Sequence, residues 1–405
     1  WEEVRVPGSR APRPTYPLVA IDPGLPPWAR PAFAGMATLN TIQSRIFPAA
    51  FGSNQNLLVC APTGAGKTNV AMLAVLREVG AHRDARSGRI DTSAFKVVYV
   101  APMKALAAEV AAAFARRLAP LGLAVRELTG DMQLTRRELA ATHMIVTTPE
   151  KWDVVTRKGG EAAVSSAVRL LIIDEVHLLN DDRGAVIETL VARTHRDVEA
   201  RQTMIRVVGL SATLPNHRDV GAFLGAPPGG VFHFDASYRP VPLDMTFIGV
   251  TERNFHAAKA VMDGLAYDKV TRALAAGHQV MVFVHSRKDT GKTGRALAAT
   301  AAAKGGEATG LFDCSAAPAF AAAARDVHKS RNAEVAELFG AGVGIHHAGM
   351  LRPDRSLTER LFSSGCIKVL VCTATLAWGV NLPAHTVIIK GTQLYNPQKG
   401  GFDDL

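Results

Sequence analysis

The stretch APTGAGKT at residues 61–68 has the residue types and spacing of a loop that binds phosphate groups. It follows an apolar run, NLLVC, and precedes a helical pattern, NVAMLAVLREV, which is the context that such a loop requires. Glycines let the backbone amides converge on a phosphate, and the start of a helix adds its dipole. Ala61 replaces the glycine that usually opens the motif, a difference of one methyl group. The loop residues expected around a nucleotide are Thr63, Gly64, Ala65, Gly66, Lys67, Thr68 and Asn69.

Within this loop, Lys67 is expected to reach the β- and γ-phosphates of ATP, and Thr68 to bind Mg²⁺. A second Gly-Lys-Thr lies at residues 291–293, in SRKDTGKTGRAL. Ser286 stands there at the position of the first glycine, and no apolar strand directly precedes the stretch. We therefore predict an ordinary helical segment at 291–293, because the surrounding sequence and not the tripeptide carries the signal.

Two adjacent carboxylates, Asp174 and Glu175, end the apolar run LLII. A helix start uses one acid near its first amides, but a pair of acids at the tip of an apolar strand suggests a cation. The carboxyl ends of parallel strands gather at one edge of a sheet, where the phosphate loop also lies. Asp174 is expected to hold Mg²⁺, and Glu175 to orient or deprotonate the water that attacks the γ-phosphate.

Three further elements lie near these residues in sequence order. His177 completes DEVH, and Ser211 and Thr213 in SAT end the next strand, where their hydroxyls are expected to bond to the DEVH segment. Gln43, upstream of the loop, suits both hydrogen-bonding edges of adenine. Each of the three is a weak signal alone, and their order and spacing together are a strong one.

The elements that must position these residues follow from the apolar runs. Five runs separated by helical patterns predict a parallel sheet covered on both faces: 56–61, 96–101, 144–148, 170–174 and 205–212. A second series predicts another such sheet: 279–284, 343–347, 367–372 and 386–390. SYRPVPL, residues 237–243, interrupts the rhythm and is interpreted as a linker. Prolines concentrate in residues 1–30, which predicts an extended arm over 1–36, followed by α/β domains at 37–240 and 241–405.

The composition describes an ordinary globular chain of 405 residues, with 48% hydrophobic and 20% charged residues. The net charge of +10 is compatible with an anionic partner and equally with a merely basic enzyme. The four cysteines show no CxxC spacing, which favours a reducing compartment, cytoplasmic or nuclear, and not secretion. His346 and His347 lack a second ligand pair, so no metal site is expected there. No apolar run approaches the ~18 residues of a membrane helix.

At the level of whole motifs, the chain resembles the superfamily-two DExH helicases of the Ski-type, Sec63-containing branch. Motifs of that branch occur in order over both domains, from about residue 33 to the end: TLNTIQ, APTGAGKT, APMKALAAE, TGD, TTPEKWD, DEVH, SATLPN, VFVHSRK, IHHAGM and TATLAWGVNLPAH. Within the branch, the wording is closest to the N-terminal cassette of the large helicase of the activating signal cointegrator complex. The spliceosomal Brr-type helicases share most of the same motifs and are the second choice.

The resemblance implies two tandem RecA-like domains that use ATP and Mg²⁺ to move 3′ to 5′ along RNA or DNA. It implies that Gln43 contacts adenine, that His177, Ser211 and Thr213 couple hydrolysis to domain movement, and that Gly379 and Asn381 of the second domain face the nucleotide. A nucleic-acid strand would contact Pro102, Lys104, Thr129, Gly130, Thr148, Pro149, Glu150, Ser286, Arg287, His347, Gly349 and Thr373. Hydroxyls, freed backbone amides and a few cations suit sugar–phosphate contacts that do not read sequence.

Members of the branch continue into an arginine motif that reaches the γ-phosphate, and this stretch is not present in residues 391–405. The second domain is therefore expected to be incomplete, and residues 1–405 to bind Mg²⁺–ATP with little nucleic-acid-stimulated turnover. Robust unwinding by this chain alone would contradict that expectation. The implied partners are the cointegrator complex or ribosomes, or alternatively spliceosomal particles. The implied role is ribosome quality control or alkylation repair.

Two other classes of function remain open at this point. A non-catalytic scaffold cassette would be expected to lose Lys67 or Glu175, and both are present. An ATPase that is not a helicase would need only one nucleotide domain, which leaves IHHAGM and TATLAWGVNLPA unexplained.

Overall fold

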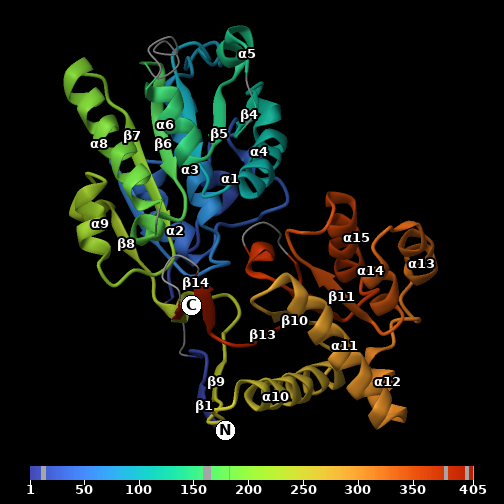
Figure 1. Ribbon diagram of the computed structural model, residues 1–405. Helices are drawn as coiled ribbons and strands as arrows, with labels where there is room; N and C mark the ends of the chain where they lie inside the picture. Colours follow the sequence, from blue (N-terminus) through green and yellow to red (C-terminus); the bar gives the residue numbers. More distant parts are fainter. Residues whose placement is uncertain are drawn as a thin grey trace. The chain divides into compact units, whose positions relative to one another are not determined.

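A computed structural model describes residues 1–10, 15–130, 132, 134–157, 166–181, 183–377, 382–396 and 401–404 (Figure 1). Gly379 and Asn381, which the sequence analysis assigns to nucleotide contact, lie outside the described residues. The chain divides into two compact units, Arg5–Met245 and Trp1–Val4 with Thr246–Leu405. The division falls within a two-stranded sheet of β1 (Glu2–Val6) and β9 (Met245–Gly249).

The unit Arg5–Met245 is built on a seven-stranded sheet with the order β4-β5-β3-β6-β7-β2-β8. All neighbouring strands in it are parallel. The strands are β2 (Leu57–Cys60), β3 (Lys96–Val100), β4 (Val125–Leu128), β5 (Met144–Thr147), β6 (Val168–Ile173), β7 (Arg206–Ser211) and β8 (Val231–His233). The five predicted runs of the first domain are confirmed as β2, β3, β5, β6 and β7. The edge strands β4 and β8 escaped prediction because they are only partly buried and lack a continuous apolar run.

Helices cover both faces of this sheet because successive strand residues point to opposite sides. Leu57 and Val59 pack into one core cluster with α2, α3 and α4, while Leu58 and Cys60 pack into the other with α5, α6, α8 and α9. These helices are α2 (Thr41–Ala50), α3 (Lys67–Ala81), α4 (Lys104–Leu118), α5 (Arg136–Ala141), α6 (Pro149–Arg157), α8 (Gly184–Arg201) and α9 (His217–Phe223). The predicted α/β class with a parallel sheet is confirmed for this unit.

The other unit has a four-stranded parallel sheet with the order β11-β12-β10-β13. Its strands are β10 (Val280–Phe283), β11 (Val343–His346), β12 (Val369–Cys372) and β13 (Thr386–Ile389), which confirms all four predicted runs. The helices are α10 (Phe255–Ala275), α11 (Arg287–Lys304), α12 (Gly306–Phe312), α13 (Phe320–Lys329), α14 (Ala333–Phe339) and α15 (Arg352–Ser363). The second Gly-Lys-Thr lies inside α11, as predicted. β14 (Gln393–Asn396) and β15 (Gly401–Asp404) form an antiparallel pair.

The segment before α2 differs from the predicted extended arm. β1 is extended, but residues 21–33 form α1 (Ile21–Gly24) and a 3-10 turn (Arg30–Phe33) that pack into the core. Leu25, Ala29 and Phe33 are buried in the core cluster that also contains α2 and α3. Pro31 lies in the first turn, where its missing amide hydrogen is not needed. Proline content alone therefore misled the prediction over these residues.

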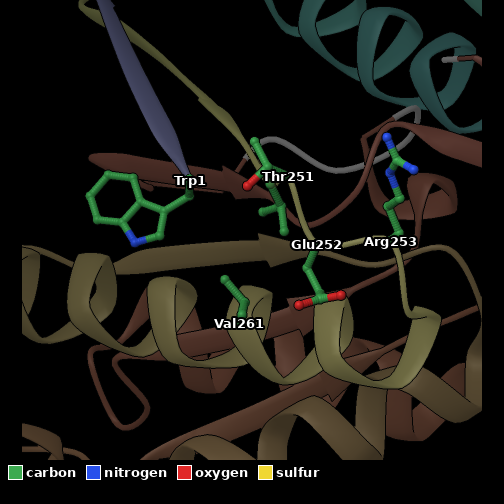
Figure 2. Close-up of a pocket in the computed structure, with 6 residues that line it drawn as sticks. Trp1, Thr251, Glu252, Arg253 and Val261 are labelled. Carbon is green, nitrogen blue, oxygen red and sulfur yellow. The ribbon is translucent and has the colours of Figure 1, made fainter.

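A pocket of about 450 Å³ lies in the unit that contains β10 (Figure 2). Its lining residues, which include none of the predicted site residues, are Trp1, Val250, Thr251, Glu252, Arg253 and Val261. Within the described part of the chain, none of the helices has both the length and the apolar character needed to span a bilayer.

Candidate nucleotide site and strand-contact edge

The phosphate loop connects β2 to α3 with the backbone that its glycines were expected to supply. Gly64 and Gly66 have φ of 80° and 87°, a left-handed conformation that residues with a Cβ rarely adopt. Gly66 also directly precedes α3, so the loop ends at a helix N-terminus. Thr63, Gly64 and Thr68 are exposed, which leaves this turn open to a ligand.

The Lys67 side chain folds back over its own loop. Its Nζ donates to the backbone oxygens of Ala61 at 2.9 Å and Pro62 at 3.4 Å. Burial lowers the pKa of Lys67, and the negative charges of Glu175 and Asp174 act in the opposite direction. Lys67 and the two acids follow β2 and β6, which end at the same edge of the parallel sheet.

The two acids follow β6 directly. The Asp174 amide continues the sheet by donating to the oxygen of Val100 in β3 at 2.9 Å. Glu175 adopts a left-handed backbone, with φ of 52°, which turns the chain sharply away from the strand. Burial raises the pKa of Asp174 to about 6, and the neighbouring Glu175 charge adds to that rise. Burial also raises the pKa of Glu175, which makes its carboxylate a stronger base.

This arrangement fits a divalent cation. The charge of Glu175 raises the pKa of Asp174, and a cation beside the two carboxylates would relieve that repulsion. Thr68 offers an exposed hydroxyl on the first turn of α3, and carboxylate and hydroxyl oxygens are the ligands that Mg²⁺ takes beside ATP phosphates. Among the described residues, no cluster of three or more His, Cys, Asp and Glu side chains forms a separate metal site.

The DEVH segment and the SAT segment are in contact through a hydrogen bond from a backbone amide and not through the predicted hydroxyls. The amide of Ala212 donates to Nδ1 of His177 at 3.3 Å. The same Nδ1 lies 3.3 Å from Oε2 of Glu175, and burial lowers the pKa of His177, with Lys67 acting in the same direction. The Ser211 hydroxyl is buried without a hydrogen-bond partner among the described residues, and Thr213 is exposed. The predicted bonds from the two hydroxyls are therefore replaced by a bond from the residue between them.

Gln43 lies against the phosphate loop with both ends of its side chain engaged. Its Nε2 donates to the oxygen of Gly66 at 3.1 Å, and its Oε1 accepts from the Asn40 amide at 3.0 Å. Asn40 completes a capping box at the start of α2, because its Oδ1 accepts from the Gln43 amide. Separately, its Nδ2 donates to the oxygen of Ala65 in the phosphate loop at 2.9 Å. In this structure Gln43 braces the loop and is buried, with 1% of its surface exposed.

The sheet order separates the two sets of predicted residues along one edge. The nucleotide residues follow β2, β6 and β7, which are neighbours in the sheet. The strand-contact residues of this unit follow β3, β4 and β5, which form the other side of it. Because all these strands are parallel, both sets lie at the carboxyl edge. The second set is Pro102, Lys104, Thr129, Gly130, Thr148, Pro149 and Glu150.

Contacts between loops hold the strand-contact set together. Lys151 Nζ donates to the oxygens of Gly130 at 3.1 Å and Met132 at 2.9 Å. The Lys104 ammonium lies so close to Gly130 that a Cβ there would overlap it. Lys104 and Lys151 therefore place positive charge beside a loop that the sequence analysis assigns to phosphate contact.

A third cation links two members of this set. Arg183 donates to the oxygen of Pro102 and lies 3.6 Å from the carboxylate of Glu150. Thr129 and Thr148 are largely buried, at 3% and 6% exposed. A nucleic-acid strand would therefore contact the backbone of the loops that carry these threonines more readily than their hydroxyls.

In the other unit, the predicted contact residues follow three neighbouring strands, β10, β11 and β12. Ser286 caps α11 by accepting from the Asp289 amide. Arg287 lies against Gly349 and His347, with atoms 3.1–3.3 Å from where a Gly349 Cβ would be. Thr373 joins this edge through its amide, which donates to the oxygen of His346 at 3.1 Å. The five predicted residues of this unit therefore share one edge.

Three residues with roles at these edges were not singled out from the sequence. Asn40 had a signal, since Asn-x-x-Gln before an apolar helix is a capping-box pattern. Tyr99, whose hydroxyl donates to Oδ2 of Asp174, had a weaker one, a hydroxyl within the apolar run KVVYVA. Arg183 had none, because its partners lie 81 residues away in Pro102 and on another helix in Glu150.

Comparison with known families identifies the class. Residues 40–220 match the DEAD/DEAH box helicase model, and residues 319–399 match the helicase conserved C-terminal domain. The first match covers the phosphate loop, the acids and SAT, and the second covers the edge after β11 and β12. The chain therefore contains a DEAD/DEAH box helicase domain and a helicase conserved C-terminal domain.

Among curated proteins, the chain is similar to the DExH-box ATP-dependent RNA helicase DExH14 of Arabidopsis thaliana, at 58% identity over the whole chain and 19% of that protein. It is similar to activating signal cointegrator 1 complex subunit 3 of Rattus norvegicus and of Homo sapiens, each at 54% identity over the whole chain and 18% of the relative. The chain thus spans about a fifth of the length of these relatives.

Among solved structures, the chain resembles a DUF1998 helicase, MrfA, bound to DNA and AMPPNP. The TM-score is 0.67 at 18% identity, and the match covers 96% of this chain and 49% of that one. At this identity the likeness supports the fold and nothing finer.

Proposed function

We propose that the protein hydrolyses ATP and uses the energy to move along a nucleic-acid strand and separate duplexes. The observation that carries this proposal is the placement of Lys67, Asp174 and Glu175 at one sheet edge, with the strand-contact set at the adjoining half of the same edge. A movement of the segment that carries the acids can thereby be transmitted through the same sheet to the strand-contact loops.

In the proposed mechanism, Lys67 exchanges its two backbone carbonyl partners for phosphate oxygens when ATP occupies the loop. Glu175 orients the attacking water and accepts its proton, and its raised pKa suits that role. Mg²⁺ held by Thr68 and Asp174 would neutralise charge on the phosphates. His177 links this site to the segment that follows β7 by accepting a hydrogen bond from the Ala212 amide.

The proposed substrate is RNA or DNA read by its backbone. Cations beside Gly130 and loops that open at glycine and proline suit phosphate and sugar contact, which carries little sequence information. The motif resemblance adds a 3′ to 5′ direction to the proposal. Strand-displacement assays on duplexes with a 3′ or a 5′ overhang test the direction, and preferential opening of the 5′-overhang duplexes would contradict it.

Two substitutions test the nucleotide site, and the second Gly-Lys-Thr supplies a matched control. Lys67→Ala should abolish detectable binding of a fluorescent ATP analogue in the presence of Mg²⁺, whereas Lys292→Ala, an exposed lysine in α11, should leave binding unchanged. Equal loss in the two variants would contradict the assignment of the loop.

Glu175→Gln distinguishes a motor from a scaffold. Made in the whole protein, the variant should bind Mg²⁺–ATP like the unsubstituted protein and lose about 10²–10⁴-fold of its hydrolysis rate, because only the base is removed. Unchanged hydrolysis would instead support a non-catalytic cassette whose turnover comes from elsewhere.

For the biological role, we propose membership of a larger complex, by similarity to the cointegrator-complex relatives. The role that we favour is ribosome quality control or alkylation repair, in the cytoplasm or nucleus, with the spliceosomal Brr-type role as the alternative. Co-purification of the tagged protein with ribosomes or with spliceosomal particles discriminates between them.

A further inference from the structure

One polar group near the acids has no part in the mechanism above. Tyr99 lies in β3 between Val98 and Val100, and none of it is exposed. Its ring packs beside Phe114 of α4, with the ring centroids 5.7 Å apart. A phenylalanine would fill this space equally well, so packing does not explain the hydroxyl.

The hydroxyl of Tyr99 donates to Oδ2 of Asp174 at 2.6 Å, a short bond typical of a charged acceptor. The Glu175 amide donates to the other oxygen, Oδ1, at 3.0 Å. Each carboxylate oxygen therefore has one fixed donor, and these two donors set the orientation of the carboxylate about its side-chain bonds. Each oxygen keeps a second lone-pair direction for a further partner.

Tyr99 is a dependable donor. An ionised carboxylate has no proton to give, so the bond between the Tyr99 hydroxyl and Oδ2 of Asp174 has the tyrosine as its donor. The aromatic ring is held by the core and has little freedom to move. Hydrogen bonds of this kind fix the orientation of metal ligands in many proteins.

We propose that Tyr99 is the positioning residue of Asp174, holding the carboxylate in the orientation in which it receives Mg²⁺ with ATP. This inference rests on the proposed function. It adds a residue that acts through Asp174 and that touches neither nucleotide nor metal itself.

The test is Tyr99→Phe, which removes one oxygen atom and keeps the ring. Binding of a fluorescent ATP analogue is titrated with Mg²⁺, and the half-saturating Mg²⁺ concentration should rise by about 10–100-fold. Binding of the same analogue in EDTA should be unchanged, since Lys67 and the loop are untouched. A purely structural role would lower the unfolding midpoint without moving the Mg²⁺ titration.

Tyr267→Phe is the matched control. Tyr267 in α10 is also buried, at 3% exposed, and its hydroxyl has no hydrogen-bond partner among the described residues. Its loss should leave the Mg²⁺ titration at the parent value. An equal half-saturating concentration in Tyr99→Phe, Tyr267→Phe and the parent protein would overturn the inference.

A double-mutant cycle with Asp174→Asn checks the route of the effect. If Tyr99 acts through Asp174, Tyr99→Phe should add little to the Mg²⁺ defect of Asp174→Asn, because the group that it positions is already altered. Additive defects would overturn the inference. Failure of the parent protein to bind Mg²⁺–ATP would instead refute the proposed function, so the two failures are distinguishable.

Discussion

Replacing Asn40 by alanine removes two side-chain bonds at the point where α2 meets the phosphate loop. Oδ1 no longer accepts from the Gln43 amide, and Nδ2 no longer donates to the oxygen of Ala65. Loss of an N-cap costs about 0.5–2 kcal/mol, and Asn40 is exposed, so a value of about 1 kcal/mol is expected for this part. The second bond adds about 0.5–1 kcal/mol, the low end for a neutral pair.

The sum predicts a loss of about 1.5–2 kcal/mol, which lowers the unfolding midpoint of a domain of about 200 residues by about 3–8 °C. Asn40→Ser separates the two parts, because serine caps a helix about as well as asparagine but is too short to reach Ala65. It should keep most of the stability and lose only the brace on the loop. Weaker preorganisation of the loop should then reduce ATP affinity by at most about fivefold in either variant.

Thermal unfolding gives the stability difference, and hydrogen exchange over residues 41–50 shows whether the loss is local to α2. Mg²⁺–ATP affinity is measured alongside. The reasoning would be refuted if Asn40→Ala unfolded at the parent temperature. It would also be refuted if Asn40→Ser lost as much stability as Asn40→Ala, since the cap would then contribute nothing.

Two further substitutions test the sheet that carries the site. Gly209→Ala in β7 places a Cβ 2.4 Å from Leu224 in the core and should lower the free energy of unfolding in urea by about 1–3 kcal/mol. Gly229→Ala, which has open space among the described atoms, is the control and should lower it far less. Equal losses in the two variants would contradict the packing argument. The buried guanidinium of Arg206 donates to three backbone oxygens near α2 at 2.8–3.0 Å, and burial lowers the pKa of Arg206 to about 10. Arg206→Ala removes all three hydrogen bonds. Its cost in urea unfolding should exceed about 3 kcal/mol, and a loss under 1 kcal/mol would show that water replaces the guanidinium without penalty.

The residues and local geometry of the candidate nucleotide site could be predicted from the sequence because their signals are local. Gly64 and Gly66 stand where the backbone needs positive φ, Lys67 follows at once, and an apolar strand precedes them. Asp174 and Glu175 can likewise be identified from the sequence because they directly follow an apolar run. Nine strands were predicted from continuous apolar residues for the same reason, since burial on both faces of a parallel sheet leaves no polar alternation.

The N-terminal segment and the edge strands could not be predicted in this way. Proline density suggested an arm over residues 1–36, but Leu25, Ala29 and Phe33 pack into the core once the sheet provides a surface for them. β4 and β8 have few buried residues because each has only one neighbouring strand.

Only the tertiary structure decided which residues meet. Tyr99 reaches Asp174 across 75 residues of sequence, and Asn40 reaches Ala65 across 25. Neither contact is indicated by a periodic pattern in the sequence, because each depends on how the strands and helices pack together and not on neighbouring residues in the chain. The sequence by itself determined the chemical groups and the strands that end in them. The order of those strands in the sheet, which nonlocal packing alone selects, decided that the residues predicted to contact nucleotide and those predicted to contact a nucleic-acid strand occupy adjoining halves of one edge.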